Sequence, residues 1–132
     1  MNGINLAAVF AAAASALVLG GAWYSPALFA TAWMRAAGIP ETQSRPAHPA
    51  RVFGGAFVLS LIAAFVFAMF LGPAPGLKLA VGAGFAAGLC WVAASVGMNY
   101  LFERRPLRLF LINSGYFTLQ FTLYGLVLGL WH

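Results

Sequence analysis

Polar side chains gather on one face of a helix predicted near the C-terminus. At about 100° per residue they fall within about 80° of arc, so they form a single polar stripe. The polar stripe consists of Asn113, Tyr116, Gln120 and Tyr124. Asn99 ends the preceding apolar segment and is expected close to it. Amides and phenols both donate and accept hydrogen bonds. These residues therefore predict either a hydrogen-bond network between helices or a contact for a ligand or solute.

The other residues able to do chemistry are too few for catalysis or metal binding. The chain has no aspartate, its glutamates are Glu41 and Glu103, and its histidines are His48 and His132. A Ser-His-Asp triad is excluded, and a zinc or bis-histidine haem site within one chain lacks ligands. Glu41, His48 and Glu103 lie in loops that could meet at one membrane face, where acid–base chemistry is conceivable. Charged residues in such loops are ordinarily solvated and have no chemical role. We predict no enzyme activity, no catalytic residue, no cofactor and no metal.

The composition indicates a membrane protein. Of 132 residues, 63% are hydrophobic and 7% are charged, whereas soluble domains carry about 25% charged residues. Disorder needs low hydrophobicity and high charge, so it is not expected either. The net charge of +5 does not indicate nucleic-acid binding, because the basic residues flank apolar segments and form no stripe. Cys90 is the only cysteine, and we expect it to be a small buried residue.

Four long apolar segments must position the polar stripe. They cover residues 4–22, 52–71, 77–101 and 107–131. Each is long enough to cross about 30 Å of hydrocarbon as a helix, and none alternates as a β-barrel strand would. The predicted fold is all-α: an integral membrane bundle of four transmembrane helices that forms a single domain over residues 1–132.

The first apolar segment ends close to a proline. It runs into Trp23, Tyr24, Ser25 and Pro26, and a proline has no N–H for the helical ladder and pushes the residue before it out of the α region. Residues 26–37 then predict a short amphipathic helix, with Trp33 on its apolar face, lying at the membrane interface. The alternative is that this helix continues the first span past a kink.

Basic residues predict the orientation. Six lie in two loops and only Lys78 lies in the turn between them; the six are Arg35, Arg45, Arg51, Arg104, Arg105 and Arg108. Basic loops face the cytoplasm, so both termini are expected outside. The cluster of Arg104, Arg105 and Arg108 is also expected to contact anionic membrane lipid, at about 1 kcal/mol per residue.

Small residues mark faces where helices can meet closely in a membrane. The second segment carries Ala56, Ser60, Ala64 and Ala68. The third carries Ala80, Gly84, Gly88 and Ser95, leading to Asn99. The fourth carries Ser114, Thr118, Thr122, Gly125 and Gly129, opposite the polar stripe. The last two glycines match a helix-pairing motif, which we expect to pack within one bundle, with pairing between subunits as the alternative.

Two blocks of sequence point to a family. The first holds Gly20, Trp23, Tyr24, Ser25, Pro26 and Trp33; the second holds residues 99–106, then Asn113, Gly115, Tyr116, Gly125 and Trp131. Together they resemble the membrane family called domain of unknown function 1761. The resemblance implies a small bacterial, sometimes fungal, integral membrane protein with about four spans, and supplies no activity. With the orientation above, this predicts a multi-pass protein of the bacterial inner membrane.

Two functions are compatible with these residues. The first is a non-catalytic bundle that self-associates and has a structural or accessory role; Asn113 then hydrogen-bonds within the bundle, to Asn99 or to a backbone carbonyl. The alternative is a small oligomeric channel or transporter that uses the polar stripe of the fourth helix, since one unit of this size has little room for a pore. The ligand or solute is left open, and no nucleic-acid partner is expected.

Overall fold

The computed structural model describes residues 3–40 and 48–132. These residues form helices and connecting turns, with no strand among them. The helices are α1 (Leu6–Trp23), α2 (Ala30–Ala37), α3 (Pro49–Leu71), α4 (Leu77–Ala86), the π-helical segment η2 (Ala87–Ala93), α5 (Ala94–Glu103) and α6 (Leu107–Leu130). Because α4, η2 and α5 follow one another without a break, we call them together the third long helix.

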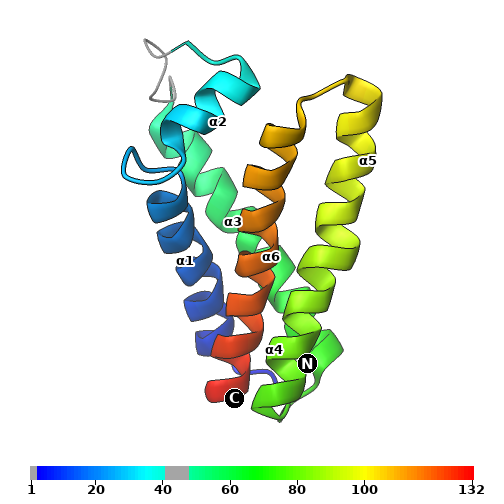
Figure 1. The fold of residues 1–132 in the computed structure, drawn as a ribbon. Helices are drawn as coiled ribbons and strands as arrows, with labels where there is room; N and C mark the ends of the chain where they lie inside the picture. Colours follow the sequence, from blue (N-terminus) through cyan, green and yellow to red (C-terminus); the bar gives the residue numbers. More distant parts are fainter. Residues whose placement is uncertain (1–2, 41–47) are drawn as a thin grey trace.

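Helix α6 lies at the centre of the bundle (Figure 1). It packs against α1 and α3 with one side and against the third long helix with the other, while α1 also packs on α3. The short α2 contacts α6 near the α6 N-terminus. Both ends of the described chain lie at the same end of the bundle (Figure 1), as expected for four long helices in up-down succession.

Three helices are long and apolar enough to cross a membrane: Leu6–Trp23, Pro49–Leu71 and Leu77–Glu103. The prediction of four such helices is wrong for α6, which is the longest single α-helix at 24 residues but is not among them. The reason is the polar stripe, whose amides and phenols lower the hydropathy of α6 below that of its neighbours. Its length, about 36 Å at 1.5 Å per residue, would still cross the hydrocarbon.

Small residues bring α4 and α6 into backbone contact. A Cβ added at Gly84 would overlap the carbonyl oxygen of Phe121, and one at Gly125 would overlap the carbonyl oxygen of Ala80. Gly129 lies against Leu77, whose Cα would be 3.1 Å from an added Cβ. The glycines of α6 are therefore used inside the chain, as we expected, and the backbone approach is that of small-residue helix pairs.

The π-helical segment shifts the buried face of the third long helix. Ala80, Gly84 and Gly88 are buried at four-residue spacing, but the next buried residue is Ala93, five residues on. A π turn accommodates one extra residue, so everything beyond it rotates relative to a regular helix. Ser95 and Asn99, which regular spacing places on the buried face, are exposed. The predicted small stripe is therefore correct up to Gly88 and wrong beyond it.

The first helix ends where the sequence predicts, but α2 begins later. Helix α1 stops at Trp23, and residues 24–29 form turns in which the Ser25 carbonyl accepts bonds from the N–H groups of Leu28 and Ala30. Helix α2 covers only Ala30–Ala37, so the predicted start at residue 26 is wrong by one turn. Its apolar side, with Trp33, is turned to the bundle, and Gly38 ends it in the left-handed region at φ 76°.

Alanine is the commonest buried residue, and many of the large apolar side chains lie outside. The most buried residues include Ala8, Ala12, Ala13, Ala16 and Ala64. By contrast Phe102 is 86% exposed, Leu101 80% and Phe70 76%. Cys90 is also exposed, so the prediction that it is buried is wrong. It lies on the outward side of the π-helical segment. Such an apolar exterior suits lipid rather than water.

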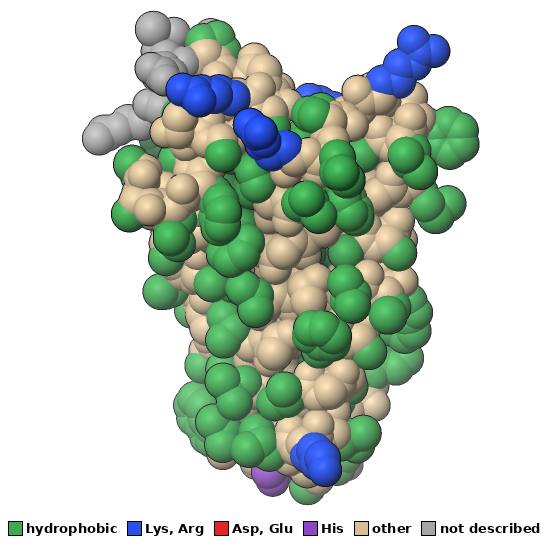
Figure 2. Space-filling view, in the orientation of Figure 1, with side chains coloured by type: hydrophobic (Ala, Val, Ile, Leu, Met, Phe, Trp, Pro, Cys, Tyr) green, Lys and Arg blue, Asp and Glu red, His purple; other side chains and the backbone are tan. Residues whose placement is uncertain are grey.

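Charge divides the two ends of the bundle (Figure 2). The end formed by α2, the start of α3 and the α5–α6 turn carries Arg35, Arg51, Arg104, Arg105 and Arg108; we call it the arginine end. The opposite end, with Lys78 and both ends of the described chain, is the lysine end. The predicted asymmetry is present in the fold, although Arg45 lies outside the described residues.

The α4–α6 contact predicts different effects for two glycines on the same helix. Gly84→Ala should destabilise the protein by about 1–3 kcal/mol, because its Cβ forces the backbones apart. Gly82 has nothing within 4 Å of an added Cβ, so Gly82→Ala should be neutral or stabilising by up to about 1 kcal/mol. Thermal unfolding in detergent measures both, and equal effects would contradict the packing described here.

Candidate functional site

Asn113 joins three segments at the arginine end. The Tyr24 hydroxyl donates to Asn113 Oδ1 at 2.6 Å, and Asn113 Nδ2 donates to the Tyr100 hydroxyl at 2.8 Å. Tyr24 follows α1, Tyr100 belongs to α5 and Asn113 lies on α6, six residues from its start. We call Trp23, Tyr24, Tyr100 and Asn113 the arginine-end network. One amide thus fixes the positions of three helices.

Asn99 is not part of this network. We expected Asn113 to bond with Asn99 or with a backbone carbonyl, and the bond within the bundle is present, but its partners are Tyr24 and Tyr100. Asn99 lies on the exposed side of α5. The π-helical segment explains the difference, because the rotation that turns Asn99 outward brings the next residue, Tyr100, onto the side facing α6.

Tyr24 is held among aromatic rings. Its ring centroid lies 5.4 Å from that of Trp33 and 5.6 Å from that of Tyr116, both in edge-to-face geometry, which is the favourable arrangement for aromatic pairs. Burial raises the pKa of the Tyr24 hydroxyl well above its ordinary value, and the nearby Tyr116 and Tyr100 hydroxyls raise it further. Tyr24 therefore keeps its proton at physiological pH and acts as a hydrogen-bond donor.

The neighbouring residues of the Trp-Tyr-Ser-Pro block hold the chain against α6. Trp23 Nε1 donates to the Ile112 carbonyl at 2.9 Å, and its ring lies on Gly115, where an added Cβ would be 3.0 Å from Cζ2. Ser25 Oγ donates to the Ala22 carbonyl at 2.7 Å, and the Ser25 N–H donates to the same oxygen at 3.2 Å. Pro26 is exposed in the turn that follows.

Tyr116 connects α6 to α1 one turn deeper. Its hydroxyl donates to the Ala16 carbonyl at 2.8 Å. An added Cβ at Gly20 would be 3.3 Å from the same hydroxyl, so this glycine leaves the space that the phenol occupies. Tyr116 thus continues the contact that Trp23 and Tyr24 begin.

Deeper still, the polar stripe ends in a buried set of bonds that we call the central network: Ser60, Gln120 and Tyr124. Gln120 Nε2 lies 2.6 Å from the Tyr124 hydroxyl, which lies 2.6 Å from Ser60 Oγ. Ser60 Oγ also lies 3.2 Å from the Ala13 carbonyl oxygen, to which it can donate, and the Tyr124 hydroxyl lies 3.4 Å from the Ser60 carbonyl oxygen. Tyr124 is 0% exposed and Gln120 8%. This chain of bonds joins α6 to α3 and α1.

Two buried polar atoms lack a hydrogen-bond partner among the described residues: Ser114 Oγ and Gln120 Oε1. The Ser114 carbonyl accepts from Thr118 Oγ1 at 2.8 Å, and Gln120 uses its amide nitrogen. Gln120 therefore takes part in the central network through its amide nitrogen alone.

Sequence reasoning placed the polar stripe on one helix and missed most of its partners. Ser60 was assigned to a small-residue stripe, and Tyr100 was not singled out. The tyrosines themselves are a usable signal in the sequence. The chain has four, and the hydroxyl of each one hydrogen-bonds in these contacts. A tyrosine inside an apolar segment needs such a partner.

The charged residues at the arginine end make only loose contacts. Arg105 Nε lies 3.4 Å from Glu103 Oε1 and Arg105 Nη1 lies 3.4 Å from the Ala37 carbonyl, both at exposed positions. Such pairs contribute little to stability. Arg104 and Arg108 are exposed, as is His48 at the start of α3. Glu41 lies outside the described residues, and within them no three metal-ligating side chains gather.

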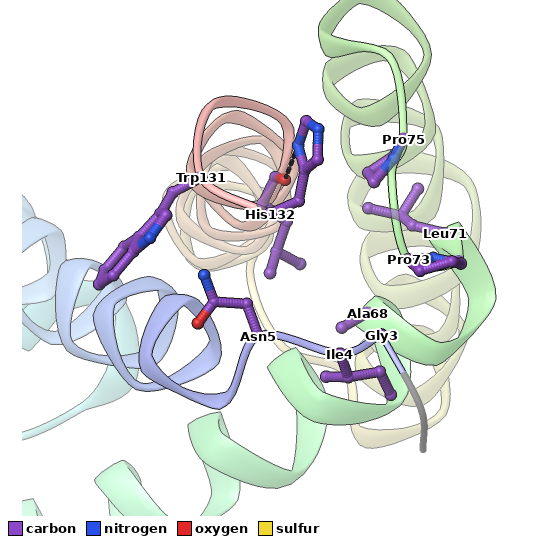
Figure 3. A pocket seen from close by; sticks show the side chains of 11 residues that line it. Gly3, Ile4, Asn5, Ala68, Leu71, Pro73, Pro75, Trp131 and His132 are labelled. Atoms are coloured by element: carbon purple, nitrogen blue, oxygen red, sulfur yellow. Dashed lines mark hydrogen bonds between the residues drawn. The ribbon is translucent and has the colours of Figure 1, made fainter.

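At the lysine end, a small cavity lies where the two chain ends meet the α3–α4 turn (Figure 3). Its volume is about 10 Å³, which is about the room of one water molecule. Asn5 on its rim caps α1, with Oδ1 accepting from the Ala8 N–H at 3.1 Å. His132 Nδ1 lies 3.3 Å from the Leu128 carbonyl. The polar groups here serve helix ends, and the space is too small for an organic ligand.

The arginine-end network predicts a specific loss on substitution. Asn113→Leu should lower the free energy of unfolding by about 0.6–2 kcal/mol, the range of such bonds between helices in lipid, because both of its bonds are lost. Asn99→Leu, an exposed control of the same chemistry, should be neutral. Thermal unfolding in detergent measures both, and an Asn99→Leu variant as destabilised as Asn113→Leu would contradict the assigned partners.

The central network predicts an ordered pair of effects. Tyr124→Phe should cost about 1–3 kcal/mol, because it leaves Gln120 Nε2 without its acceptor in a buried position. Gln120→Leu should cost less than about 1 kcal/mol, because Tyr124 keeps Ser60 as a partner. Melting temperatures report both. Should Gln120→Leu leave stability untouched while abolishing a cellular phenotype or a solute flux, the stripe would be a functional surface instead.

Comparison with known proteins gives one match. The family described as protein of unknown function (DUF1761) matches over residues 7–129. No curated protein and no solved structure matches the chain. The matched range contains the Trp23–Pro26 block, Ser60 and Tyr124, and it includes every residue of both networks. On this match over nearly its whole length, the chain belongs to the DUF1761 family.

Proposed function

We propose that this protein is a four-span integral protein of the bacterial inner membrane, with a non-catalytic structural or accessory role. The observation that carries the proposal is the use of the polar stripe of α6. Asn113, Tyr116, Gln120 and Tyr124 all bond to groups of other helices or to one another. Side chains that are engaged in this way hold a bundle together and are not displayed for a substrate.

The same bonds support a fourth span. Polar groups are costly in hydrocarbon unless they are paired, and Asn113, Tyr116 and Tyr124 of α6 bond to Tyr24 after α1, to α1, to α3 and to α5. Helix α6 would therefore enter the membrane as the centre of a bundle rather than as a separate apolar helix. Beyond Arg108 at its start, its exposed side chains are apolar, such as Leu111, Leu119 and Leu126.

The charge distribution supports one orientation. The arginine end carries the described basic loops, and the lysine end carries one lysine and both ends of the described chain. Basic loops are retained on the cytoplasmic side. We place the arginine end in the cytoplasm and both termini outside.

Burial favours a structural role over transport. Tyr124 and Gln120 lie near the middle of α6 and are almost fully enclosed. A solute path along the polar stripe would have to displace these side chains and break the central network. A self-associating form would also need a surface other than the Gly125 and Gly129 pair, because α4 already covers it.

Reporter fusions test the orientation. A fusion at the C-terminus should be active as a periplasmic phosphatase and dark as a cytoplasmic fluorescent protein. An insertion in the turn at Arg104 should give the opposite pattern. The protein should also stay in the membrane fraction after alkaline carbonate extraction. A fluorescent C-terminal fusion would reverse the orientation, and release by carbonate would contradict the integral-membrane assignment.

A further inference from the structure

A groove opens between α5 and α6 toward the arginine end, where the two helices diverge (Figure 1). Its volume is about 380 Å³, and its lining includes Ala94, Gly97, Met98, Tyr100, Arg105 and Phe110. Gly97 lets the Phe110 ring approach, since an added Cβ would be 2.8 Å from Cε1. The volume is within the range of small-molecule sites, about 300–1,000 Å³.

The groove is apolar along its length and cationic at its mouth. Arg105 lines it at the end of α5, and the adjacent Arg104 and Arg108 are exposed at the same end. Glu103 is the acidic residue beside them, and its contact with Arg105 is long and exposed. The Tyr100 hydroxyl accepts the Asn113 amide and so keeps its own hydrogen to donate. Both polar groups of the lining can bind an anion.

A second hollow adjoins this groove. It has a volume of about 490 Å³ and shares Ala94 and Phe110 with the first. Its lining includes Ser114, whose buried Oγ lacks a partner among the described residues. The two hollows extend the apolar surface from the arginine end toward the middle of α6.

We propose that this groove binds one anionic phospholipid, with an acyl chain along α5 and α6 and the phosphate at Arg105 and Tyr100. The length fits. From Arg105 to Ala94 is eleven residues, about 16 Å of helix, or roughly half of a 30 Å hydrocarbon core. That is the depth of one leaflet, with the cationic mouth at headgroup level.

Charge also argues against a second copy of the chain as the occupant. In one membrane, two copies lie in the same orientation, so their arginine ends would meet at the same depth. The described residues at this end offer Glu103 against Arg35, Arg51, Arg104, Arg105 and Arg108. Such a contact repels, whereas an anionic headgroup is attracted by about 1 kcal/mol per basic residue.

This inference rests on the proposed membrane location and has its own test. The full-length protein is purified in neutral detergent, and binding of phosphatidylglycerol and acyl-matched phosphatidylcholine is measured by native mass spectrometry. We expect one phosphatidylglycerol to bind preferentially. Arg105→Gln should weaken its binding about fivefold, the effect of one basic residue of about 1 kcal/mol. Arg51→Gln, which removes the same charge at the same end outside the groove, should not.

A second pair of variants tests the acyl-chain site. Ala94→Phe should fill the groove and abolish the preferential binding, whereas Ala14→Phe, at an exposed alanine of α1, should retain it. Equal binding of the two lipids, or equal effects within either pair of variants, overturns the proposal. So does a dimer that Ala94→Phe converts to monomer, since a second copy would then occupy the groove. If carbonate retains the protein in the membrane and these tests fail, the groove inference alone is wrong.

Discussion

The need to pair the amides and phenols of α6 organises the structure. Helices in lipid gain little from burying apolar surface against one another, so hydrogen bonds and close contacts must specify which helices meet. Here all four tyrosines of the chain serve this purpose: Tyr24, Tyr100, Tyr116 and Tyr124. The bonds run from α6 to α1, α3 and α5, and they explain why the least apolar of the long helices is the central one.

The opposite face of α6 allows the backbone of the third long helix to approach closely. Gly125 and Gly129 admit the backbone of α4, and Thr118 meets Gly88, where an added Cβ would be 2.7 Å from the threonine Cα. Toward the arginine end, Ser114 is the last small residue of this face, and the next residue on the face is Phe110, one turn closer to that end. A large ring cannot be accommodated at the same helix separation, so α5 diverges from α6. The groove is therefore a consequence of where the small-residue stripe ends.

Much of this fold could be predicted from the sequence, because helix length, polar stripe and basic loops are local patterns. The register beyond Gly88 could not, since a π turn changes the periodicity without a proline or another marker in Ala87–Ala93. That one change exposes Asn99 and brings Tyr100 to Asn113. Ser60 was missed for a related reason: a small residue in an apolar helix predicts close packing, and only the fold shows that its hydroxyl meets Tyr124.

The arginine-end network and the groove share one residue. Donors run in a single direction, from the Tyr24 hydroxyl to Asn113 and from the Asn113 amide to Tyr100. Tyr100, which carries the last hydroxyl in this series, lines the groove. An anion that accepted its hydrogen would complete the series, and consecutive hydrogen bonds in a low-dielectric setting polarise and strengthen one another. Occupation of the groove would then tighten the contact of α5 with α6 and α1 through Asn113, so that a bound lipid would stabilise the very end of the bundle where the helices diverge.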